Sequence, residues 1–190
     1  MCLTNLIVPY DPDWKTGFEE LKQVLMAALS HFEIDIQHIG STSIPGLCAK
    51  PILDIDIVLS AREDKDAISV RLEELGYKNA GEQGIAGRFA FKQLSGRVPK
   101  THNDKDWQAH HLYVCYFDSL ALKNHLVFRN ALLTQPSLMN MYAQLKQELV
   151  KDVYMTREDY TKRKTAFIVS VLASACLDEK ELNEITKANL

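Results

Sequence analysis

Hydrophobic residues recur every three or four positions in five stretches of the chain, the spacing typical of helices that pack one face on a core. Asp13 is placed to cap the first of these helices, and Pro136 separates the third from the fourth. Thr156 and Asp159 have the layout of a capping box in front of the last one. The predicted helices cover about residues 14–30, 64–75, 120–133, 137–151 and 157–177.

Four other stretches are rich in β-branched and apolar residues or alternate between apolar and polar positions, as strands do. They cover residues 32–39, 51–59, 88–94 and 110–117. This order of elements predicts an α/β or α+β fold, a mixed β-sheet of four or five strands followed by a C-terminal helical lobe. We expect one domain over residues 1–177, with a core of about 1–118 and a lobe of about 119–177, and then a polar tail over 178–190.

The composition is that of an ordinary globular protein, with 46% hydrophobic and 25% charged residues among 190. The 22 basic and 25 acidic residues give a net charge of −3, so no overall field attracts nucleic acid or an anionic membrane. The longest apolar stretch, residues 166–177, is too short to span a bilayer, and no secretory signal is recognisable. We therefore expect a cytoplasmic protein without a membrane or nucleic-acid partner. The scattered cysteines, which form no zinc or redox motif, are Cys2, Cys48, Cys115 and Cys176.

Asp54 and Asp56 interrupt an otherwise apolar strand. Alternation along a strand points both carboxylates to the same face, with Cα atoms roughly 6–7 Å apart. Two like charges so placed repel each other unless something neutralises them. Mg²⁺ does so with a few carboxylates, phosphate oxygens and water. The other interpretation is a solvent-facing side of the strand, where alternating polar residues are normal.

The segment Gly40-Ser41-Thr42-Ser43 follows a predicted strand and precedes a turn or helix. Backbone N–H groups and three hydroxyls can converge on an anion in such a turn. A phosphate-binding turn about a dozen residues before a pair of strand aspartates is the layout of metal-dependent nucleotidyl transfer. The combination is far more specific than either feature alone.

These residues carry a resemblance to a known family. Segments 38–47 and 49–55 resemble the signature of the GrpB family, which belongs to the DNA polymerase beta-like nucleotidyltransferase superfamily. The resemblance implies a nucleotidyltransferase-like α/β core with trailing helices. It implies much less about the substrate. The turn and the paired aspartates indicate a nucleoside triphosphate or another phosphorylated small molecule as ligand. Further similar positions, found between residues 10 and 168, are Gly84, Gly87, Phe91, 110–114, 125–126, 128–129, Tyr142, 145–146, Tyr160, Lys164 and 167–168.

The resemblance gives each candidate site residue a role. Asp54 and Asp56 would hold Mg²⁺ and, together with His111, form the catalytic group. For the cations on predicted helices, the alternative is ordinary surface charge. The candidates for binding phosphate or substrate are Gly40, Ser41, Thr42, Ser43, Lys50, Arg88, Lys92, Arg129, Lys146 and Lys164.

Two departures from the family pattern bear on activity. Tyr113 stands where the family usually has a histidine, and the strand over residues 110–117 lacks the third carboxylate of active superfamily members. His111 or Tyr113 would then face the aspartates, and the acids left as substitutes lie in predicted loops: Glu82, Asp104 and Asp106.

Two accounts of function remain open. One is a Mg²⁺-dependent nucleotidyltransferase that transfers a nucleotidyl group from a nucleoside triphosphate to an unknown acceptor. The other is a nucleotide- or phosphate-ligand-binding protein of the same fold with weak or no turnover. A purely structural protein whose helical lobe binds a partner has no positive support in the sequence.

Overall fold

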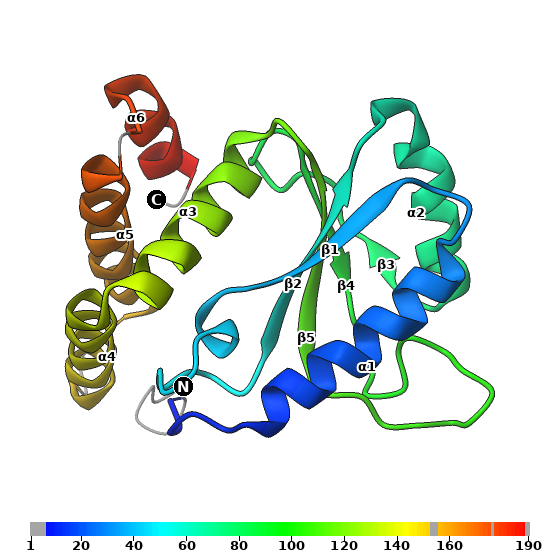
Figure 1. Cartoon of the computed structure of the whole chain (residues 1–190), viewed down its shortest axis with the longest axis horizontal. Helices are drawn as coiled ribbons and strands as arrows, with labels where there is room; N and C mark the ends of the chain where they lie inside the picture. The colour runs from blue at the N-terminus through cyan, green and yellow to red at the C-terminus, as the bar shows by residue number, and fades with distance from the viewer. Residues whose placement is uncertain (1–6, 153–155, 176, 189–190) are drawn as a thin grey trace.

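The strands form one mixed sheet in the order β1-β2-β5-β4-β3 (Figure 1). The computed structural model describes residues 7–152, 156–175 and 177–188 of the chain. Strands β2 and β5 are parallel, and the other neighbouring pairs are antiparallel. The predicted mixed sheet is confirmed, and the sequence pattern missed only the two-residue β3. The strands are β1 (Ile34–Ile39), β2 (Leu53–Leu59), β3 (Lys78–Asn79), β4 (Arg88–Lys92) and β5 (His110–Tyr116).

Two helices pack on one face of the sheet, and the last three form a lobe beside it (Figure 1). The main core joins α1 and α2 to the apolar face of the strands, where Leu21, Ile55 and Val114 are fully buried. Helix α3 lies between the sheet and the lobe (Figure 1). The helices are α1 (Asp13–Ala28), α2 (Lys65–Glu74), α3 (Leu120–Thr134), α4 (Pro136–Lys151), α5 (Arg157–Ser174) and α6 (Glu179–Ala188), with short 3₁₀ turns η1 (Ser41–Ser43) and η2 (Arg62–Asp64).

The helix ends confirm one predicted cap and correct another. Thr156 caps α5, because its Oγ1 accepts a hydrogen bond from the Asp159 amide at 3.0 Å. Asp13 does not cap α1. It is the first residue of that helix, and its amide donates to the carboxylate of Asp11 at 3.0 Å.

Most of the predicted polar tail is a helix. Residues 179–188 form α6, whose polar composition hid two apolar anchors: Ile185, buried against Leu172 and Leu177, and the partly buried Leu182. Reciprocal hydrogen bonds fix its start, since Asp178 Oδ1 accepts from the Glu181 amide and Glu181 Oε2 accepts from the Asp178 amide.

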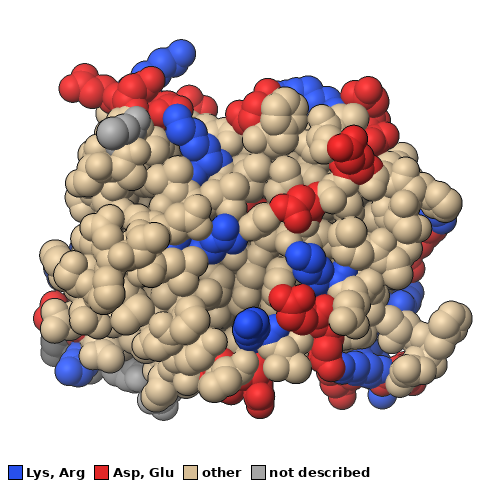
Figure 2. Space-filling view, in the orientation of Figure 1, with Lys and Arg blue, Asp and Glu red and all other residues tan. Residues whose placement is uncertain are grey.

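Charges of both signs are interspersed on the face shown in Figure 2, in keeping with the small net charge. None of the described helices is long and apolar enough to cross a membrane.

Candidate functional site

Polar residues from three strands share the face of the sheet opposite to α1 and α2. Asp54 is in register with His111, and Asp56 with Tyr113. Lys92 of β4 is also in register with His111, so it lies on the same face as Asp54. The sequence predicted a site in which Lys92 and the two aspartates line the same face of the sheet. The strand register places them on one face.

Asp56 is completely buried, with 0% of its surface exposed. Its Oδ2 accepts a hydrogen bond from Nδ1 of His125 on α3 at 2.7 Å. Its Oδ1 is also buried and, within the residues that the structure describes, has no hydrogen-bond partner. The thiol of Cys115 hydrogen-bonds to the Asp56 carboxylate, and burial, reinforced by the charge of Asp56 and by this contact, raises the pKa of that thiol. A thiol is only a weak donor, so a buried carboxylate held by one imidazole and one thiol still favours a cation at Oδ1.

Asp54 is partly buried and lies between two contacts that fix its position. Nδ1 of His111 donates to its Oδ1 at 2.9 Å. On the other side is Gly40, which has a φ of +70°. A Cβ on this residue would come within 2.2 Å of Asp54 Oδ2. The glycine is therefore required both by the backbone conformation and by the close approach of the carboxylate.

Replacing Gly40 by Ala is expected to lower the free energy of unfolding and to displace Asp54. Gly81→Ala is a matched control, because Gly81 has a φ of +69° but a Cβ added there would meet no described atom within 4 Å. Both variants carry the cost of a positive φ, which is of order 1–3 kcal/mol. Only Gly40→Ala adds a steric conflict, which costs typically about 1–3 kcal/mol more. Equal denaturant midpoints for the two variants would contradict this description of the turn.

The turn after β1 uses two of its three hydroxyls internally. Thr42 is buried and its Oγ1 lies 3.0 Å from Nε2 of His38, while Ser43 Oγ donates to the carbonyl of Gly40 at 2.7 Å. Burial lowers the pKa of His38 to about 4, so this imidazole is neutral and acts as a support for the turn. Ser41 is the hydroxyl left to face the site. The sequence predicted that three hydroxyls of this turn bind an anion. In the structure, the groups left for that role are the Ser41 hydroxyl and the backbone amides of the turn.

Lys146 of the lobe lies beside Ser41, and Lys164 is joined to the same hydroxyl through Tyr142, which hydrogen-bonds to both Ser41 and Lys164. Nζ of Lys146 donates to Ser41 Oγ at 3.1 Å and to the carbonyl of Cys48, and the side chain is 2% exposed. Burial lowers its pKa to about 8. The pKa of Lys164 is raised, chiefly by the adjacent phenol of Tyr142 and further by Tyr160 and Asp54. Two ammonium groups next to the turn make this end of the site suited to an anion.

The remaining candidate cations are distributed around the site. Arg129 of α3 donates to Gln37 Oε1 at 2.8 Å and to the carbonyl of His38 at 2.9 Å, and burial lowers its pKa. Lys92 is exposed. Nζ of Lys50 lies 5.4 Å from the ring centroid of Tyr160. Arg129 therefore fixes the strand before the turn, whereas Lys146 contacts Ser41 directly.

Arg88 lies at the other end of the same face. It is in register with Cys115 of β5, two residues beyond Tyr113, and its guanidinium carbon is 4.5 Å from the ring centroid of Tyr113. The structure therefore does not bring Arg88 to the turn with Ser41, although sequence reasoning had grouped the two.

A third carboxylate does not join the two aspartates from β5. The loop acids considered as substitutes have other neighbours: Asp104 pairs with Arg97 at 2.9 Å, and Glu82 accepts from the Gly87 amide at 2.7 Å. Asp106 lies beside Gly96 in the loop whose Lys105 pairs with Glu20 of α1, on the opposite face of the sheet. Among the described residues, no group of three or more His, Cys, Asp or Glu side chains is arranged to hold a metal ion.

Sequence reasoning missed the contacts made by α3. His125 and Gln37 were assigned no role, although they hold Asp56 and Arg129 in place. One signal was available. His125 and Arg129 are four residues apart on a predicted helix, so they lie on the same face of it.

The fold and this arrangement define a protein with a nucleotidyltransferase-like fold. The structure of a Cid1 poly(U) polymerase mutant bound to MgATP superimposes with a TM-score of 0.60, covering 94% of this chain and 55% of that one, at 14% identity. The chain belongs to the GrpB protein family, whose model matches residues 5–174. The crystal structure of the conserved protein GrpB from Enterococcus faecalis is similar over 95% of this chain and 98% of its own, with 30% identity and a TM-score of 0.71.

Curated relatives of the family include longer proteins. UPF0157 protein YqkA of Bacillus subtilis is 34% identical over 75% of this chain, but the chain spans only 39% of YqkA. A UPF0157 protein of Pseudomonas aeruginosa is 31% identical over 89% of the chain, which spans 66% of that relative.

Proposed function

We propose that this protein is a Mg²⁺-dependent nucleotidyltransferase that moves a nucleotidyl group from a nucleoside triphosphate to a hydroxyl acceptor. The observation that carries the proposal is the buried Asp56 carboxylate with one oxygen lacking a partner among the described residues, on the same face as Asp54. The resemblance in fold to Cid1, which is titled a poly(U) polymerase with MgATP bound, supports the same class of chemistry.

The triphosphate would lie against the turn after β1. Ser41 and the backbone amides of the turn donate to phosphate oxygens, and the ammonium groups of Lys146 and Lys164 balance the charge. Placing an anion here also relieves the repulsion between two neighbouring buried cations. The β- and γ-phosphates are the groups that fit this end.

Asp54 and Asp56 would hold Mg²⁺. Two carboxylates are enough, because Mg²⁺ usually takes one or two from the protein and completes its shell with substrate phosphates and water. The ion would supply charge neutralisation at the transferring phosphoryl group. His111 and His125 each bond one oxygen of these carboxylates and so hold their orientation.

The transfer is a displacement at the α-phosphorus. The acceptor oxygen forms a bond to that phosphorus while the bond to the oxygen bridging to the β-phosphate breaks, and pyrophosphate leaves with the electron pair. The acceptor's hydroxyl proton passes to water. Lys146 and Lys164, which lie where the pyrophosphate departs, offset its growing negative charge.

The proposal is tested by a thermal-shift screen of nucleotides with and without Mg²⁺, followed by mass spectrometry for pyrophosphate and nucleotidylated product. Binding at 100 times the dissociation constant adds roughly 2.7 kcal/mol of stability, which gives a clear shift in Tm. Failure of every nucleoside triphosphate to stabilise the protein with Mg²⁺ present would refute the proposal.

A second candidate is a nucleotide-binding protein with little or no turnover. It is favoured by one observation, that β5 places His111 and Tyr113 opposite the aspartates where active members of the superfamily have an acid. Histidine can bind a metal but adds no negative charge to hold it. Binding of Mg²⁺-nucleotide without pyrophosphate release would support this candidate over the enzyme.

The affinity for polyphosphate is expected to fall as the pH rises through about 8, because that is the pKa of Lys146. Below this pH the side chain is charged and attracts phosphate. Above it the charge is lost, and affinity declines by up to about tenfold per pH unit. Titration of tripolyphosphate by calorimetry from pH 7 to 9.5 measures the effect. Lys146→Met should remove this pH dependence, and Lys162→Met, on an exposed position of α5, should keep it. Identical profiles for the two variants would contradict the assignment of Lys146.

A further inference from the structure

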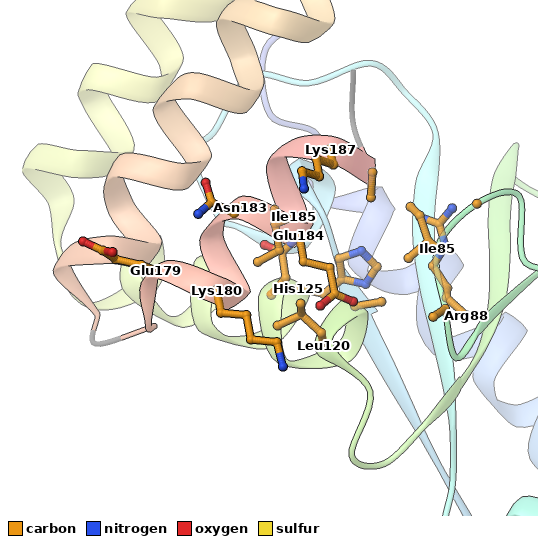
Figure 3. A pocket seen from close by; sticks show the side chains of 15 residues that line it. Ile85, Arg88, Leu120, His125, Glu179, Lys180, Asn183, Glu184, Ile185 and Lys187 are labelled. Atoms are coloured by element: carbon orange, nitrogen blue, oxygen red, sulfur yellow. The ribbon is translucent and has the colours of Figure 1, made fainter.

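An open pocket lies at the end of the site away from the turn. It has a volume of about 830 Å³ and is lined by α6, the first half of α3 and residues 84–86 and 88. In Figure 3, α6 carries Asn183, Glu184 and Lys187 on one side, with Ile85 and Arg88 across from them. This is the size of a small-molecule site.

The pocket is continuous with the aspartates through one residue. His125 lines the pocket and also donates to Asp56 at 2.7 Å. The opposite end of the site is marked by Gly40, which follows the β1 residue in register with Asp54. Arg88, in register with Cys115, marks the pocket end. Along the sheet, the order is therefore turn, Asp54, Asp56 and pocket.

This order matches the geometry of an in-line displacement. If pyrophosphate leaves toward the turn, the attacking hydroxyl must approach the α-phosphorus from the far side of the aspartates. We propose that the pocket between α6 and Arg88 is the acceptor site, an inference that rests on the proposed nucleotidyl transfer. The acceptor oxygen becomes bonded to the α-phosphorus, pyrophosphate is released at the turn and the hydroxyl proton goes to water, as in the reaction above.

Two cations indicate the chemical class of the acceptor in a pocket that Glu179 and Glu184 also line. Nε of Arg88 is buried and has no hydrogen-bond partner within the described part of the chain. Its guanidinium is held against the ring of Tyr113, and Lys187 of α6 lies across the pocket from it. Arginine in a fixed orientation binds phosphate or carboxylate groups well. The acceptor is a small hydroxylated molecule that carries an oxyanion, either a phosphate or a carboxylate.

Helix α6 forms one wall of the pocket. It begins at Glu179, beyond residue 174, where the family model ends. The helix is anchored by Ile185 in an apolar cluster and by the ion pair between Glu181 and Lys123 of α3 at 2.5 Å. Its polar side is thereby directed to the pocket. Helix α6 therefore contributes to the choice of acceptor, while the turn and the strand aspartates hold the nucleotide.

The test uses the whole chain saturated with Mg²⁺ and a non-hydrolysable nucleoside triphosphate analogue. Ribose 5-phosphate and gluconate provide the phosphate and carboxylate arms, and ribose is the uncharged comparison. Affinity is measured by calorimetry, and NMR shifts of the α6 amides report the place of binding. We expect at least one oxyanion probe to bind ten times or more tighter than ribose and to shift the α6 amides.

Two variants test the two cations of the pocket, Arg88 and Lys187, independently. Arg88→Met keeps an unbranched apolar side chain beside Tyr113 but removes the guanidinium, and Lys187→Glu changes only the surface of α6. Each should weaken binding of the oxyanion probe about tenfold or more, and Lys187→Glu should leave nucleotide affinity unchanged. Lys162→Glu on α5 is the charge-matched control and should bind the probe like the wild type.

Three results would overturn the acceptor assignment: no probe binds to the nucleotide-saturated protein, the two variants bind it like the control, or the nucleotide alone shifts the α6 amides. The last result would show that the nucleoside occupies this pocket. A protein that binds the probe at α6 but binds no nucleotide would refute the proposed function and leave the oxyanion pocket in place.

Discussion

The double variant Asp54→Asn/Asp56→Asn is expected to lose Mg²⁺-dependent nucleotide binding and to become more stable in the absence of metal. Both effects follow from charge. The two carboxylates lie on one face of β2, and one of them is fully buried, so a bound cation relieves their repulsion. Amides of the same shape remove both the repulsion and the attraction for Mg²⁺.

Calorimetry with Mg²⁺ and a nucleoside triphosphate measures the loss directly. The stabilisation of roughly 2.7 kcal/mol at 100 times the dissociation constant should disappear from the variant, and any turnover should fall by about 10²-fold or more. Asp118→Asn is the control, because Asp118 forms an exposed ion pair with Arg62 at 2.6 Å, outside the site. Unchanged Mg²⁺-nucleotide affinity in the double variant would show that the aspartates hold no metal.

The single variant Asp56→Asn separates the two carboxylates. Asp56 has the oxygen without a partner among the described residues, so its replacement should account for most of the lost affinity. His125 can still donate to the amide oxygen of Asn, which keeps α3 in place against β2. If Asp54→Asn lowered the affinity for Mg²⁺-nucleotide and Asp56→Asn did not, the cation would lie nearer to the turn than Oδ1 of Asp56.

The parts of the site that sequence predicted are those encoded within a few consecutive residues. Asp54 and Asp56 share a face because strands alternate, and Gly40-Ser41 form a turn because a glycine follows a β-rich stretch. These features need no knowledge of distant contacts. The strand boundaries were predicted to within two residues for the same reason.

The parts that it missed depend on contacts between distant elements. The hydroxyl of Thr42 is turned inward because His38 is buried by Phe18 of α1, with ring centroids 4.5 Å apart. His125 reaches Asp56 across 69 positions of sequence. Residues 179–188 contain too few apolar residues to predict a packed helix, and Ile185 is buried only because α3 and α5 provide a surface for it. Local pattern cannot supply these partners.

The missing acid leads to the prediction with the largest expected gain. His111 lies directly opposite Asp54 in the register of β2 and β5, and its side chain is 55% exposed. Aspartate at this position would place a third carboxylate on the face that already holds two. The added charge should raise the affinity for Mg²⁺ by about tenfold or more, since each further carboxylate ligand strengthens the attraction for a hard cation.

His111→Asp is therefore expected to raise nucleotidyl transfer at least about tenfold over the wild type, measured as pyrophosphate release with Mg²⁺ and a panel of hydroxyl acceptors. Without Mg²⁺ the same variant should melt at a lower temperature than the wild type, because three carboxylates repel one another. His111→Asn is the matched control, which removes the imidazole and its hydrogen bond to Asp54 but adds no charge. Its turnover should not rise.

Two outcomes would contradict this account. Tighter Mg²⁺ binding by His111→Asp with turnover equal to that of His111→Asn would show that a third carboxylate is not what limits the chemistry. Rapid transfer by the wild type that survives Glu82→Ala, Asp104→Ala and Asp106→Ala would show that Asp54 and Asp56 suffice with their histidine partners. In that case the two histidines hold the carboxylates in the orientation needed for metal binding, without a third acid. His111 of β5 bonds to Asp54, and His125 of α3 bonds to Asp56.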